Sequence, residues 1–171
     1  MRHLIARIAE RQHLLVTLLA VWLILSSPWV QLLRRIPREA GFLAYAHVAL
    51  GFLALLPGLT FTAACVRKGR WRLYFPWLTG RLRQSAHDLA GLVRGRMPTA
   101  EGGGLIMLIE GLLLLAFVAT AATGAAWFWA QGSGEAMAWR RHHLFAAHWL
   151  IGLLVVHVVA GALHIFEFVR G

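Results

Sequence analysis

The chain has 171 residues, of which 59% are hydrophobic, and it carries a net charge of +10. This composition excludes a soluble globular domain, because a domain of this size needs more polar surface. The positive charge does not indicate nucleic acid, because apolar runs separate the arginines into short flanks that suit anionic lipid headgroups. The length allows one domain, residues 1–171.

Four apolar runs reach the length of roughly 20 residues that crossing a bilayer requires. They lie at about residues 14–33, 40–66, 102–130 and 142–169. We expect the first run to be an uncleaved helix rather than a signal peptide, because it is long and no clear A-x-A site follows it. The pattern therefore predicts an all-α integral membrane protein built as a four-helix bundle.

The basic residues predict the direction of the spans. Twelve of the 17 Lys and Arg residues lie on the side that holds both termini and the connection between the second and third spans. The other five lie on the opposite side: Arg34, Arg35, Arg38, Arg140 and Arg141. By the positive-inside rule, both termini are expected in the cytoplasm.

The connection between the second and third spans is longer than a helix hairpin needs. In it, Leu82, Ala86, Leu89 and Val93 recur at spacings of four, three and four. Arg81, Arg83, Gln84 and Asp88 occupy other positions of the segment. This pattern predicts a short amphipathic helix that lies on the inner membrane surface.

Four of the nine histidines lie at informative depths. His13 lies at the inner end of the first span, His47 in the outer part of the second, and His143 at the outer start of the fourth. His157 follows 14 residues after His143. Fourteen residues make almost four helical turns, so these two histidines share a face, about 40° and about 21 Å apart. At matching depths, His47 pairs with His143 and His13 with His157.

Two pairs of imidazoles at two depths of a helix bundle are what two six-coordinate haems require. The axial ligands of one haem approach from opposite sides, so they are expected from different helices. The chain has one cysteine, Cys65, and no C-x-x-C-H motif, so the haems would be non-covalent haem b. For any single histidine, the alternative is a hydrogen bond to a neighbouring helix.

Three glycines lie on the histidine faces. Gly51 and Gly58 follow His47 by 4 and 11 residues, and Gly161 follows His143 by 18. Such small residues either make room for a haem or allow close contact between helices. Because these glycines accompany the histidines, the sequence favours neither space for a haem nor close helix contact over the other.

The fourth span carries the most specific sequence pattern. It contains His143-Leu-Phe-Ala-Ala and then Val156-His157-Val158, and it is accompanied by His13, His47 and Phe75-Pro76-Trp77-Leu78. With these residues the chain resembles the di-haem cytochrome b family, which includes the membrane subunits of formate dehydrogenases and nickel–iron hydrogenases and stand-alone single-chain relatives.

The resemblance implies a function in electron transfer. A member of this family passes electrons between a redox partner and the quinone pool in the bacterial inner membrane. The implied partner is a dehydrogenase, an iron–sulfur subunit or a cytochrome c subunit, and quinone is the substrate. A stand-alone quinone oxidoreductase is an alternative within the same class.

Three further residues are candidates for a quinone or proton site near the inner surface. Glu110 lies inside the third span, where a charged group is costly, and Glu101 lies just before it. His164 lies seven residues after His157 on nearly the same face. The alternatives are a protonated Glu110 that makes one hydrogen bond and a solvated His164 at the helix end.

Two other classes of protein remain open from the sequence. A non-redox transporter or assembly protein would bind a transition metal through histidines clustered at one depth, with carboxylates nearby. A structural subunit would keep the fold without the haems.

Overall fold

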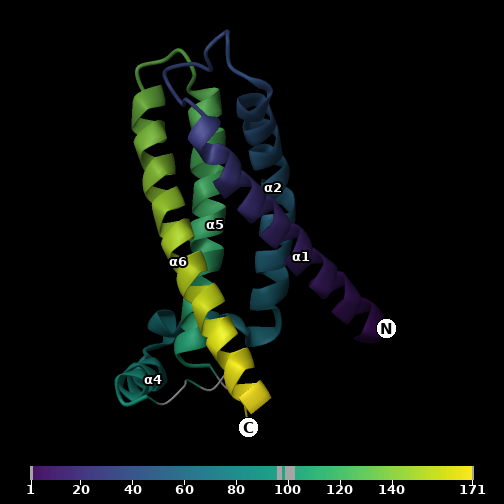
Figure 1. Cartoon of the computed structure of the whole chain (residues 1–171), viewed down its shortest axis with the longest axis vertical. Helices are drawn as coiled ribbons and strands as arrows, with labels where there is room; N and C mark the ends of the chain where they lie inside the picture. Colours follow the sequence, from purple (N-terminus) through teal and green to yellow (C-terminus); the bar gives the residue numbers. More distant parts are fainter. Residues whose placement is uncertain (1, 96–97, 99–102, 171) are drawn as a thin grey trace. The chain divides into compact units, whose positions relative to one another are not determined.

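The structure, a computed structural model, describes residues 2–95, 98 and 103–170. Figure 1 shows the helices in chain order. They are α1 (Arg2–Ser26), η1 (Ser27–Trp29), α2 (Phe42–Val66), η2 (Arg67–Gly69), α3 (Trp71–Tyr74), η3 (Pro76–Thr79), α4 (Arg83–Val93), α5 (Leu105–Trp129) and α6 (Ala136–Arg170).

Four helices of the described residues are long and apolar enough to cross a membrane. The spanning segments are Arg11–Trp29, Phe42–Val66, Leu105–Trp129 and Ala136–Leu163. Large apolar side chains on these helices are exposed, for example Phe42 at 82% and Leu56 at 68%. For the described residues, the prediction of an all-helical chain with four helices able to span a membrane is therefore confirmed.

The first helix differs from its predicted bounds at both ends. It already begins at Arg2, and its α-helical part ends at Ser26, whereas the sequence predicted a span to about Leu33. A 3-10 turn follows and ends at Trp29. Pro28 lies in this turn and has no amide hydrogen with which to continue the α-helix.

The last helix begins at Ala136, six residues before its predicted start. Gly132 has a φ of +83°, which turns the chain before the helix, and the carbonyl of Glu135 accepts the first helical hydrogen bonds. Arg140 and Arg141 therefore lie in the helix and not in a flank. Charge marks a membrane boundary in a sequence, but it does not end a helix.

The described chain divides into two compact units. The first consists of the residues up to Ala64 together with Ala116–Trp149. The second consists of Cys65–Leu115 together with the residues from Leu150 onward. Each unit is described by itself.

Four helical segments pack together in the first unit. The ring of His13 in α1 lies 5.7 Å from the ring of Phe61 in α2, and Phe52 in α2 meets Phe128 in α5 edge-on at 5.0 Å. In this unit, the end of α5 and the start of α6 form an antiparallel hairpin (Figure 1). Aromatic and small apolar residues thus join α1, α2 and α5 along their length.

The loop between α1 and α2 is anchored on this hairpin. Leu32, Trp127 and Ala136 form a buried cluster, in which Trp127 is 1% exposed. The indole Nε1–H of Trp127 donates to the carbonyl of Leu33 at 3.0 Å, and the side chain of Gln131 accepts the amide of Ile36 at 3.0 Å. The anchored loop fixes the ends of α1 and α2 against α5 and α6.

In the second unit, helix α4 buries two of its polar residues and exposes its predicted apolar face, while Arg83, Gln84 and His87 are exposed as well. Ser85 and Asp88 are buried, whereas Leu89 is 56% and Val93 87% exposed. The amphipathic helix predicted at this position is therefore present, with its apolar face on the outside.

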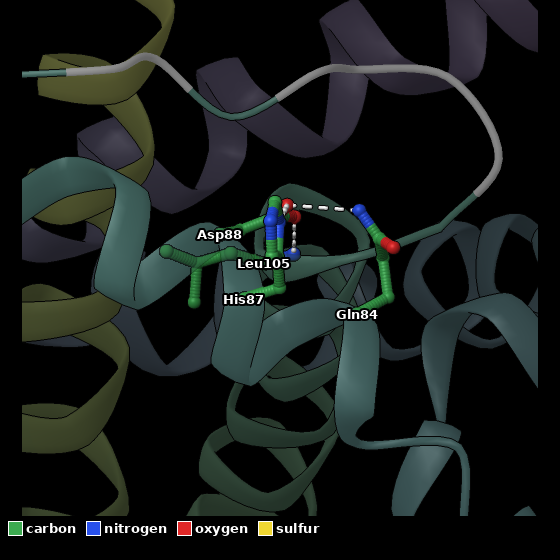
Figure 2. Close-up of polar contacts among 4 residues, drawn as sticks. All are labelled: Gln84, His87, Asp88 and Leu105. Carbon is green, nitrogen blue, oxygen red and sulfur yellow. Dashed lines mark hydrogen bonds and ion pairs between the residues drawn. The ribbon is translucent and has the colours of Figure 1, made fainter.

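Asp88 connects α4 to the first turn of α5 (Figure 2). Its Oδ2 accepts the amide of Leu105 at 2.9 Å, and its Oδ1 accepts the side-chain amide of Gln84 at 2.9 Å. The amide of Leu105 has no partner within α5, because the first residues of a helix lack a preceding carbonyl. Gly104 has a φ of +92°, and a Cβ there would overlap the Asp88 carboxylate.

Replacing Asp88 with alanine is expected to lower the free energy of unfolding by about 1 kcal/mol, the usual value for a lost helix cap. Asp88→Asn keeps an oxygen acceptor and should lose much less. The measurement is thermal unfolding of the detergent-solubilised protein, followed by circular dichroism. Equal stability of the alanine and asparagine variants would show that the cap does not contribute.

Candidate functional site

His47 is held by the end of α1. Its Nδ1 lies 2.8 Å from the hydroxyl oxygen of Ser26, a residue that is 5% exposed. That hydroxyl donates its own hydrogen to the carbonyl of Leu23 at 3.1 Å. The Ser26 hydroxyl therefore lies between the Leu23 carbonyl and Nδ1 of His47, and this contact holds the orientation of the ring.

His143 is held by α5 in the same way. Its Nδ1 lies 2.9 Å from the backbone carbonyl oxygen of Thr120. A carbonyl oxygen only accepts, so Nδ1 of His143 carries the ring proton. Its position is tightly enclosed, because a Cβ added at Gly124 would lie 3.1 Å from both Cε1 and Nδ1 of the ring.

Together His47 and His143 form the candidate site: both lie in the first unit, and a neighbouring helix holds each of them. The Nδ1 of each imidazole is engaged by a hydrogen bond, so Nε2 is the ring nitrogen left to face a ligand. Described residues make no hydrogen bond to either Nε2. A metal-binding histidine is usually fixed in this manner, by a hydrogen bond from the nitrogen that does not bind the metal.

Sequence reasoning found both histidines but missed the groups that orient them. Ser26 precedes His47 by 21 residues, and Thr120 precedes His143 by 23. A serine at a helix end and a backbone carbonyl carry no signal of this role in the sequence.

The other two candidate histidines lie in different units. His13, in the first unit, is exposed and rests on the ring of Phe61. His157, in the second unit, is half-buried in α6. Their expected pairing stays a prediction.

The three candidate glycines have different surroundings. Gly58 is buried, and a Cβ there would overlap the ring of Phe117 in α5, so this glycine allows close packing of α2 and α5. A Cβ at Gly51 or at Gly161 would meet no atom within 4 Å. These two positions border open space in the described chain.

Glu110 in the second unit belongs to a group of ionisable residues around Tyr74. Its charge acts on both the Cys65 thiol and the Tyr74 phenol, which also interact with each other. A guanidinium nitrogen of Arg70 donates to the Tyr74 hydroxyl at 3.2 Å. Tyr74 is 4% exposed and went unnoticed in the sequence. Glu101 and the side chain of His164 lie outside the described residues.

Burial raises the pKa of Tyr74 to about 12, and the nearby Cys65 and Glu110 act in the same direction, while Arg70 opposes them. An unfolded tyrosine loses its proton near pH 10. Between about pH 10 and 12 the folded protein therefore holds a proton that the unfolded chain has lost, and stability falls as the pH rises.

We expect this titration to be visible in a Tyr45→Phe variant, because the chain has two tyrosines. The ultraviolet absorbance of tyrosinate should appear near pH 12 in the folded protein and near pH 10 after denaturation. Coincident titration curves in the two states would contradict the buried position of Tyr74.

Comparisons with protein-family models, with curated proteins and with solved structures find no match to this chain. The chemistry of the site therefore has to be argued from its own residues. Among the described residues, no group of three or more His, Cys, Asp or Glu side chains is placed to hold a metal ion. The donor set of the candidate site is instead two neutral imidazoles from two helices.

Proposed function

We propose that this chain is a b-type cytochrome that crosses the membrane, holds two haems non-covalently and transfers electrons between a redox partner and the quinone pool. The observation that carries the proposal is the pair His47 and His143, each held through Nδ1 by a neighbouring helix. Haem iron takes two axial ligands, and bound haem supplies one-electron chemistry.

The residues of the first unit fit such a group. Two neutral imidazoles from different helices match the axial donors of a six-coordinate haem. Gly124 leaves the ring of His143 just enough space to lie against α5. The second haem is proposed to take His13 and His157, which the sequence places at a common depth.

Quinone would react near the inner surface. Glu110 is the candidate for proton exchange there among the described residues. Its charge acts on Cys65 and Tyr74. The Tyr74 hydroxyl accepts a hydrogen bond from Arg70. Glu101 and His164 complete the proposed quinone and proton site. The redox partner would be a dehydrogenase, an iron–sulfur subunit or a cytochrome c subunit, unless the chain works alone as a quinone oxidoreductase.

The proposed location is the bacterial inner membrane, with both termini in the cytoplasm, as the distribution of Arg and Lys favours. Helix α4 would lie on the inner surface. The outward position of Leu89 and Val93 supports this, because exposed apolar side chains on a short helix suit the boundary of headgroups and acyl chains.

The test is the haem content of the purified full-length chain. A pyridine haemochrome assay should give two haem b per chain, and the reduced protein should show sharp α-bands. A preparation that contains a transition metal but no haem would support the transporter alternative. A preparation with neither would support a structural subunit. Either result would overturn the proposal.

If haem is present, addition of a reduced quinone should reduce part of it. Oxidised quinone should reverse this reduction. If the haem exchanges no electrons with either form of quinone, the assignment as a cytochrome stands, but the proposed reaction with the quinone pool is wrong.

A further inference from the structure

Arg140 in α6 is a cation whose partner is missing from the described residues. Its guanidinium Nε is buried and has no hydrogen-bond partner. The neighbouring Arg141 is exposed. Buried polar groups of folded proteins are nearly always hydrogen-bonded, so the buried N–H of this partly exposed side chain indicates a missing acceptor.

The position of Arg140 in the helix shows where this anion should lie. Arg140 precedes His143 by three residues, so it lies about 4.5 Å further along α6 and about 60° around it, on the same side. The unpaired donor is therefore the neighbour, on the outer side, of a candidate haem ligand.

Two sources could supply a negatively charged oxygen group at this place. A lipid phosphate would reach the arginine from the outer surface of the helix. Haem b carries two propionates at one edge of an otherwise apolar ring. The burial of Nε and its closeness to His143 favour the propionate.

We propose that Arg140 binds a propionate of the haem that His47 and His143 ligate. This inference rests on the proposed function. Arg140 acts as a positioning residue: it fixes the rotation of the haem about the axis between the two histidines. Its positive charge also favours the reduced state of the iron, because reduction adds a negative charge nearby.

The experiment compares Arg140→Gln with Arg141→Gln, which makes the same change of charge one residue away at an exposed position. Redox titration of the purified full-length protein should show that Arg140→Gln lowers the midpoint potential of one haem. The expected change of the reduction equilibrium is about tenfold, which for one electron corresponds to about 59 mV. Arg141→Gln should leave both potentials nearly unchanged.

A second arm identifies the anion. The apoprotein is reconstituted with a haem whose propionates are methyl esters, which removes their charge. If Arg140 binds a propionate, the difference between wild type and Arg140→Gln should largely disappear with this haem. A difference that persists would assign Arg140 to a lipid phosphate or to a structural role, and would overturn the inference.

Arg140→Lys keeps the positive charge, and it is the variant to measure if Arg140→Gln does not fold. It should hold the potential closer to that of the wild type than any neutral replacement does. Equal potentials of the Arg140 and Arg141 variants, with both haems present, would overturn this inference alone. Absence of haem from the wild-type protein would overturn the proposed function as well.

Discussion

A His143→Ala variant is expected to contain one haem b per chain instead of two. Alanine has no donor atom, so a haem that His143 would hold under the proposed function would lose a ligand, and a non-covalent haem would then be released. His47→Ala should lose the same haem, because the proposal assigns both imidazoles to it and neither Nε2 is hydrogen-bonded to a described residue. The double variant should therefore lose no more haem than either single variant.

The measurements are haem per chain by pyridine haemochrome and the α-bands of the reduced variants at low temperature. His148→Ala is the matched control, because His148 lies in the same helix, is exposed and bonds to its own helix at the Leu144 carbonyl. It should retain both haems. A double variant of His47 and His143 without any haem would show that the two belong to different haems. Full haem content in both single variants would refute the ligand scheme.

Gly111→Ala is expected to lower the stability of the second unit by about 1–3 kcal/mol, the usual cost of an added group in a filled interior. Gly111 is buried in α5, and a Cβ there would overlap the backbone carbonyl of Tyr74. A flexible side chain could turn away from the new methyl group. A backbone carbonyl moves only if the α3 segment moves with it.

Loss of helical circular dichroism during titration with a denaturing detergent gives the stability of the variant. Gly152→Ala is the matched control, because a Cβ at Gly152 meets no atom within 4 Å and alanine favours the helix. It should be as stable as the wild type or slightly more stable. Equal behaviour of the two alanine variants would show that α3 does not pack on α5 at Gly111.

The number and type of the long helices followed from the sequence, but their ends did not. Composition alone identifies a spanning segment, because crossing the lipid bilayer requires an apolar run of about 20 residues. The ends depend on local hydrogen bonds. Pro28 stopped α1 before the predicted boundary, and the turn at Gly132 allowed α6 to begin before Arg140.

The candidate ligands could also be named from the sequence, because residue type, depth and helical phase are all periodic properties of the chain. Helical phase alone places His143 and His157 on one face of a single helix, and no tertiary contact is needed for this conclusion. The pairing of His13 with His157 rests on this reasoning and stays a prediction.

The contacts between helices decided the surroundings of the candidate residues, which a periodic sequence pattern does not contain. The hydrogen bonds of His47 to Ser26 and of His143 to Thr120 fix the orientation of each ring, and they join residues more than 20 positions apart. The buried Nε of Arg140 likewise depends on how α6 is surrounded. Hydropathy and spacing follow from covalent order, whereas the available nitrogen of an imidazole depends on which atom of a neighbouring helix lies beside it.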